Sequence, residues 1–146
     1  MKSKLLHEQE GLRTYALVFD GGDSVMKELE TFARGEQLGA AHFTAIGALS
    51  EVVLGYFDWE RKDYTEIPLR EQVEVLTLAG DVALSGDEPS VHAHLVVGRS
   101  DGSAAGGHLI EGKVRPTLEL ILTETPAHLH KRKDAETGLA LIDLDA

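Results

Sequence analysis

The chain contains no cysteine, so it can form neither a disulfide framework nor a thiolate metal site. It also lacks an apolar run approaching the roughly 18–20 residues that a helix needs to cross a bilayer. Residues 1–8 have no apolar stretch behind their lysines, so we expect no secretory signal and take the cytoplasm as the default location. Walker loops, nucleophile elbows and H-E-x-x-H motifs are absent, which excludes the enzyme classes that depend on them.

Positive charge is scarce. The chain has 14 Lys and Arg against 25 Asp and Glu, a formal net charge of −11. Such a domain repels a phosphate backbone unless its cations gather on one face. The only basic run is Lys131-Arg132-Lys133, and Asp134 and Glu136 follow it closely. The composition therefore disfavours DNA binding by this domain alone.

The 146 residues, 42% of them hydrophobic, are enough to bury one substantial core. We find no internal repeat, low-complexity tract or linker, and therefore predict that residues 1–146 form a single domain.

One amphipathic helix is predicted near the N-terminus. Asp23 or Ser24 can cap it, because a short side-chain oxygen accepts the free N–H groups of the first turn. Gly39 is the predicted stop, and Gly35 lies in or near the last turn. Helical spacing places four apolar residues on one face: Val25, Leu29, Phe32 and Ala33.

The rest of the chain alternates with a period of two, which is typical of strands. A turn at residues 48–50 should separate the second and third strands, and Gly80 should mark a bulge or bend. Residues 137–146 are apolar enough to return as an edge strand or to pack against a neighbour. One helix with seven or eight strands predicts an α+β domain with a strongly curved, mostly antiparallel sheet. The predicted strands are 13–20, 41–48, 51–59, 64–68 (short), 71–84, 91–99, 104–112 and 115–123.

His92 and His94 form an H-x-H pair within one predicted strand. Alternation places both imidazoles on the same sheet face, roughly 7 Å apart at the backbone. This spacing lets two imidazoles reach one ion with bonds of about 2.0–2.1 Å.

A hairpin brings in a third histidine. Residues 99–102 (Arg-Ser-Asp-Gly) are typical of a three-residue loop with a left-handed glycine, which pairs Arg99 with Ser103. His94 then lies opposite His108 on the same face. A two-residue turn would instead send His108 to the other face, and a bulge at Gly106-Gly107 would also change this parity.

His92, His94 and His108 are therefore the candidate metal ligands. Three imidazoles without a fourth protein ligand are typical of an open zinc site, although nickel, copper or iron would also suit them. The alternative is three polar residues on a solvated face. A cupin-like site is disfavoured, because no glutamate follows His94 within a few residues.

Other candidates are weaker. His128 and His130 repeat the spacing without a third partner, which favours surface histidines. His42 suits either the core or the wall of a site. Any of four strand glutamates could supply a general base beside a metal, and the sequence does not choose among them. They are Glu51, Glu74, Glu111 and Glu119.

The chain resembles the plants-and-prokaryotes conserved domain (PPC or PCC), labelled in bacteria as a predicted DNA-binding protein with a PD1-like motif. One segment is similar to the G-R-F-E-I-L-S-L-S-G stretch of plant members, with Glu71-Gln72 replacing Gly-Arg. The similar segments are Ile46–Val52, Leu54–Asp58, Glu74–Gly80, His92–His94, Gly107–Leu109 and Lys133–Leu139.

The resemblance implies one helix on a curved, mostly antiparallel sheet, a homotrimer, and zinc held by His92, His94 and His108. No established reaction accompanies the family. In plants the domain accompanies an AT-hook and serves nuclear targeting and protein contacts, but this sequence contains no R-G-R-P core.

We therefore expect a homotrimeric, zinc-binding protein whose open site serves a small ligand or hydrolytic chemistry. Whether it is an enzyme is left open. The alternatives are a DNA-associated regulatory protein, as the family label suggests, and an interaction module in which the metal is only a structural staple.

Overall fold

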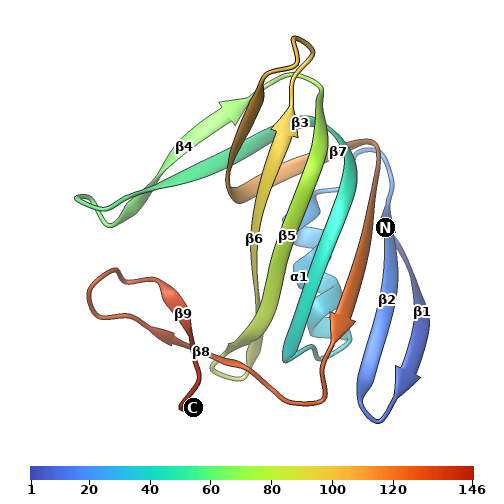
Figure 1. The fold of residues 1–146 in the computed structure, drawn as a ribbon, viewed down its shortest axis with the longest axis vertical. Helices are drawn as coiled ribbons and strands as arrows, with labels where there is room; N and C mark the ends of the chain where they lie inside the picture. Colours follow the sequence, from blue (N-terminus) through green and yellow to red (C-terminus); the bar gives the residue numbers. More distant parts are fainter.

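The computed structural model describes residues 1–146 and contains one helix and nine strands (Figure 1). The single helix confirms the sequence prediction, and it is not long and apolar enough to cross a membrane. The elements in chain order are β1 (Lys2–Gln9), β2 (Leu12–Phe19), α1 (Val25–Gly35), β3 (Ala40–Asp58), β4 (Asp63–Leu69), β5 (Val73–Ser85), β6 (Glu88–Gly98), β7 (Ala104–Glu124), β8 (His130–Lys133) and β9 (Ala140–Asp143).

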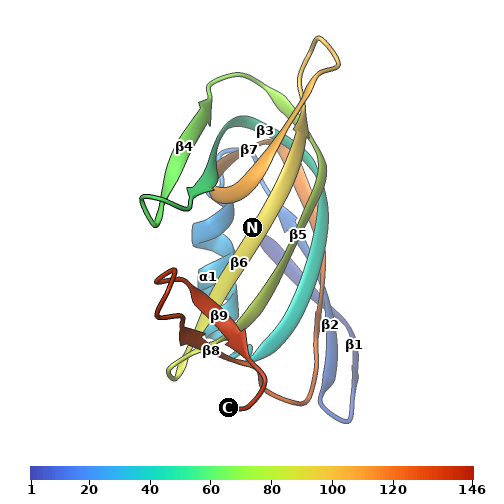
Figure 2. The same cartoon turned by 60° about the vertical axis from the view of Figure 1, so that its left-hand side comes forward.

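All nine strands belong to one sheet with the main order β1-β2-β7-β3-β5-β8-β9. β4 pairs with β3, and β6 pairs with both β5 and β7, so four strands close into a ring: β3, β5, β6 and β7. Every pairing is antiparallel except the one between β5 and β8. The strongly curved, mostly antiparallel sheet predicted from the sequence is confirmed, and Figures 1 and 2 show how β3 and β7 bend to form it.

The two longest strands correct the predicted boundaries. The expected turn at residues 48–50 is wrong, because β3 runs through it with register shifts between Gly47 and Leu49 and between Leu49 and Glu51. β7 likewise joins the strands predicted at 104–112 and 115–123. Bulges of this kind bend a strand without ending it, so a long strand can pair with different partners along its length.

Helix α1 packs its predicted apolar face into the core, where Val25 and Leu29 are almost fully buried. Ser24 is the N-cap residue, but its hydroxyl donates to Glu111 (2.8 Å) and does not cap the helix. The helix ends at Gly35, a turn before the predicted stop at Gly39, and Gln37 reverses the chain with a left-handed φ of 54°.

Gly80 lies in regular register between Phe43 and Ala93, so the predicted bulge there is wrong; the irregularity is between Val75 and Thr77. A Cβ on Gly80 would lie 2.3 Å from the carbonyl oxygen of His92 and 2.4 Å from Cζ of Phe43. Glycine is needed here for close packing.

Candidate metal centre

Strand alternation in β6 places His92 and His94 on the sheet face opposite the core, because the intervening Ala93 and the following Leu95 are buried. We call this the outer face. The next strand, β7, supplies His108, which pairs directly with His94.

The predicted hairpin register is confirmed. The backbone N–H of Arg99 donates to the carbonyl oxygen of Ser103 (2.8 Å), and Gly102 adopts the left-handed φ of 83° that such a loop requires. Ala105, Gly106 and Gly107 pair with β6 without a register shift, so no bulge turns His108 away.

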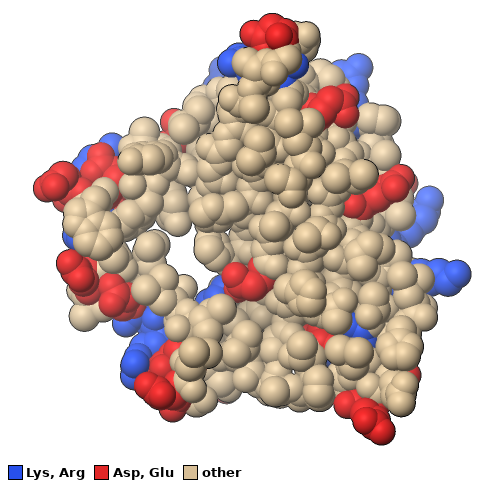
Figure 3. All heavy atoms as spheres, in the orientation of Figure 1, with Lys and Arg blue, Asp and Glu red and all other residues tan.

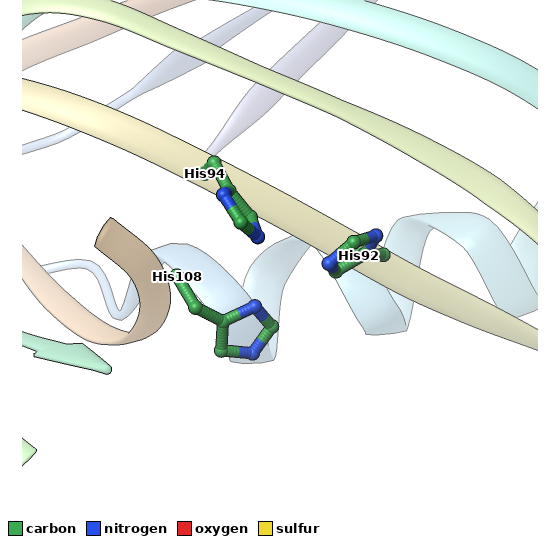
Figure 4. Close-up of side chains that lie close together, drawn as sticks. All are labelled: His92, His94 and His108. Atoms are coloured by element: carbon green, nitrogen blue, oxygen red, sulfur yellow. The ribbon is translucent and has the colours of Figure 1, made fainter. Parts of the chain in front are cut away.

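The three imidazoles converge. One ligand nitrogen from each of His92, His94 and His108 lies within 4.8 Å of the others, and the ring centroids are 5.0 to 5.3 Å apart. Figure 4 shows all three side chains directed into the same space. Tetrahedral zinc bonds of about 2.0–2.1 Å separate donor atoms by about 3.4 Å. Small side-chain rotations therefore bring these nitrogens onto one ion.

Two projecting hairpins flank the cluster. Tyr64 of β4 stacks on His108, with ring centroids 4.5 Å apart and an interplanar angle of 20°. On the other side, β8 brings Lys131 to the carboxylate beside His92. Figure 3 shows the molecular surface hollowed between these hairpins, β3–β4 and β8–β9. We call this hollow the recess. The histidine cluster contacts one of the two hairpins through Tyr64 and the other through Asp81 and Lys131, and the His92 side chain is 46% exposed.

Asp81 of β5 supports His92 from behind. Its Oδ2 lies 3.4 Å from Nδ1 of His92, and its Oδ1 lies 3.0 Å from the ammonium of Lys131, an ion pair without hydrogen-bond geometry. Burial opposes ionisation of Asp81, but the interactions with His92 and Lys131 outweigh it and hold its pKa below the ordinary value. A carboxylate on the second ring nitrogen is the common support of a metal-bound histidine.

The electrostatics favour neutral imidazoles. Burial, with the neighbouring His92 and His94 as smaller causes, lowers the pKa of His108 to about 4. Burial and the neighbouring His92 also lower the pKa of His94. Neutral imidazole is the form that binds metals, so these two ligands need lose no proton at neutral pH.

One of the three histidines has a ring nitrogen without a partner in the protein. The Nδ1 atom of His108 is buried and has no hydrogen-bond partner, although buried polar side-chain atoms are usually paired. A metal ion would satisfy it. The geometry therefore favours a site for a divalent transition metal over the alternative that these are three unrelated polar residues on a solvated face.

The remaining sequence candidates lie outside the cluster. His42 pairs with Asp81 across the sheet, His128 packs against Gly39, and His130 belongs to β8. None of the four candidate glutamates forms an ion pair or hydrogen bond with the three histidines: Glu51 and Glu111 line a separate cavity of about 530 Å³, and Glu74 and Glu119 line another of about 480 Å³.

Sequence reasoning missed Tyr64, Asp81 and Lys131. Tyr64 and Lys131 approach the cluster only because β4 and β8 are carried there by the curved sheet. Asp81 had a signal, since it pairs with His92 in the β5–β6 hairpin. Counting outward from the turn at Gly86-Asp87 would have placed the carboxylate next to the imidazole.

A curled sheet with one helix and a three-histidine recess defines an α+β domain with a candidate metal centre. The sequence pattern of the Plants and Prokaryotes Conserved (PCC) domain matches residues 6–126, and the chain belongs to this family.

Three known proteins illustrate the relationship. The metal-containing protein AF0104 from Archaeoglobus fulgidus is 33% identical, with a TM-score of 0.81 over 88% of this chain and 91% of that one. A candidate DNA-binding protein from Ralstonia eutropha JMP134 is 34% identical, with a TM-score of 0.82 over 89% and 90%. The bifunctional protein GlmU of Synechococcus sp. (strain JA-3-3Ab) is 35% identical over 130 residues, which is 87% of this chain but only 20% of that protein.

The depressed pKa of His108 predicts a pH-dependent stability of the metal-free protein. The unfolded chain, with an ordinary histidine pKa of about 6.5, binds a proton more readily than the folded protein. The free energy of unfolding should therefore be highest above pH about 6.5 and fall as the pH drops toward about 4.

His108→Gln should remove part of this loss, as measured by urea unfolding at several pH values with a chelator present. The control His7→Gln changes an exposed histidine of β1 and should follow the parent profile. Identical pH profiles for His108→Gln and the parent would contradict the prediction.

Proposed function

We propose that this protein is a homotrimeric zinc-binding protein whose three-histidine centre serves a small ligand or hydrolytic chemistry. The observation that carries the proposal is the convergence of His92, His94 and His108 on one point, with a buried unsatisfied nitrogen among them. A related protein, AF0104, is described as metal-containing, and this supports a metal in the family.

Zinc is the metal that this donor set suits best, because three neutral imidazoles match its tetrahedral preference. The cluster contains no carboxylate or thiolate that would complete a closed structural site. When bound, such an ion supplies a Lewis acid with one coordination position for water or a ligand. The site is therefore suited to a ligand that enters from the solvent-exposed recess.

The residues around the recess define what that ligand meets. The stacked ring of Tyr64 covers one side of His108 and limits its imidazole to small rotations. Asp81 is partly exposed on the opposite side of the cluster, and the buried Lys131 behind it offsets its charge. These contacts would hold the three histidines in place around a bound ion.

Assembly into a trimer is supported by the exposed surface of the sheet. Large apolar side chains from five strands share the outer face and are 38% to 63% exposed. The register makes Ile121 a diagonal neighbour of both Val18 and Ile46, because both pair with Glu119, two residues before it. Ile46 and Leu76 line one cavity, and Val96 pairs with Thr77, the residue after Leu76. An apolar face of this kind marks an interaction surface. Its members are Val18, Ile46, Leu76, Val96 and Ile121.

Replacing all three histidines should abolish metal binding. Elemental mass spectrometry should find about one zinc per chain in the untagged parent, as one three-histidine centre requires, and none in His92→Ala/His94→Ala/His108→Ala. The matched control His128→Ala/His130→Ala changes the other H-x-H pair and should keep the metal. Unchanged metal content in the folded triple variant would refute the site.

A charge in the outer face should disrupt assembly. Ile121→Glu places a carboxylate among apolar side chains, so sedimentation analysis should show a trimer for the parent and monomers for this variant. The control Leu144→Glu changes a residue that is 84% exposed near the C-terminus and should remain trimeric. A parent that sediments as a monomer at every concentration would exclude the trimer.

The alternative function is DNA association, which is supported by the description of the Ralstonia relative. The charge distribution opposes it, because two members of the only basic run are engaged in ion pairs: Lys131 with Asp81 and Arg132 with Asp143. We expect no mobility shift with any duplex at low salt. A complex whose affinity falls steeply as salt rises would favour the alternative instead.

A further inference from the structure

Lys131 is a buried cation beside the candidate centre. The three-histidine site described above assigns it no role. Only 4% of its side chain is exposed, in contrast to the usual position of lysine at the surface. Its ammonium donates to the backbone carbonyl of Ser90 (3.2 Å) and lies 3.0 Å from Asp81 Oδ1. A buried charge is costly unless it is paired and hydrogen-bonded. Asp81 supplies the opposite charge, and the Ser90 carbonyl accepts a hydrogen bond.

The strand that carries Lys131 is fixed by backbone hydrogen bonds. The N–H of Leu84 donates to Leu129 (2.8 Å), and the N–H of Leu129 donates to Gly39 (2.9 Å). β8 therefore continues the sheet beside the end of β5, where Ser85 pairs with Lys131. The β8–β9 hairpin is thus docked firmly enough to hold a side chain in a set position.

Asp81 divides its two oxygens between this lysine and a candidate metal ligand. Oδ1 faces Lys131, and Oδ2 lies 3.4 Å from Nδ1 of His92. A carboxylate at Nδ1 favours the tautomer with its proton on that nitrogen, which leaves Nε2 free to bind a metal. Without Lys131, the partly buried carboxylate would lose its counter-charge and the restraint on its orientation.

We propose that the β8–β9 hairpin sets the metal affinity of the centre, with Lys131 acting as a positioning residue through Asp81 and His92. The hairpin lies beyond residues 6–126, the part of the chain that matches the family pattern. The inference rests on the proposed metal-binding function. It adds a residue that controls metal affinity without being a candidate ligand.

The test compares zinc affinities at neutral pH by competition with a chromogenic chelator. Lys131→Met keeps the aliphatic stem and removes the charge, and should weaken binding roughly 10- to 100-fold, the usual effect of losing a supporting partner of a ligand. The control Lys133→Met changes an exposed residue of the same strand and should bind like the parent. Lys131→Gln, which keeps a donor for Ser90, should show the same loss if the methionine variant does not fold.

A double-mutant cycle separates positioning from a general structural effect. If Lys131 acts through Asp81, then Asp81→Asn/Lys131→Met should bind zinc within about twofold of Asp81→Asn alone. The visible spectrum of the cobalt(II)-loaded protein should change in Lys131→Met and not in Lys133→Met, because only the former alters the geometry at His92.

The outcomes distinguish this inference from the function on which it rests. A parent that binds no zinc overturns both. Parent-like affinity in Lys131→Met and Lys131→Gln, or losses that multiply in the double variant, overturns the positioning role and leaves the three-histidine site intact.

Discussion

The register between β6 and β7 is the constraint on which the candidate centre depends. His94 pairs with His108 because the loop after Gly98 fixes which residues face each other. A slip of one residue would turn Leu109 outward and His108 into the core, which loses apolar burial and buries an imidazole at once. The hydrophobic pattern of β7 and the loop chemistry therefore specify the same alignment, and the candidate centre depends on that agreement.

The centre combines two environments, one that favours neutral side chains and one that favours an ionised side chain. Around His108, burial and the neighbouring imidazoles lower its pKa, and burial likewise lowers the pKa of His94, so these two side chains are neutral at neutral pH. Around Asp81, close contacts with His92 and Lys131 outweigh burial and preserve an ionised carboxylate. In the metal-free protein, Asp81 and Lys131 offset each other's charge beside the cluster, so neither charge is left unpaired there.

The sheet's curvature shapes both the recess and the outer face. Bending of β3 and β7 lets β6 pair with β5 on one side and β7 on the other, which closes the core around α1. The same bending carries β4 away from the rest of the sheet (Figure 2). Tyr64 of β4 can therefore stack on His108. The outer face meanwhile stays broad and apolar, with Ile46 63% exposed. One backbone feature thus shapes both the recess and the proposed trimer interface.

Local sequence patterns determined a large part of this protein. The face shared by His92 and His94 follows from strand alternation, the partner His108 from the hairpin loop, and the buried side of α1 from helical spacing. Each of these depends on residues close together in the chain, or on a single tight turn. Such features can therefore be predicted without knowledge of the rest of the fold.

Tertiary structure alone decided where the long strands bend and what surrounds the histidines. The patterns around residues 48–50 and 112–115 are compatible with either a turn or a bulged strand, and the pairing of β3 with β7 selects the strand. Tyr64 and Lys131 reach the centre across strands far apart in sequence, a meeting that sheet closure produces and no local spacing encodes. The sequence by itself therefore determined the three candidate ligands, whereas the closed sheet decided how they are held.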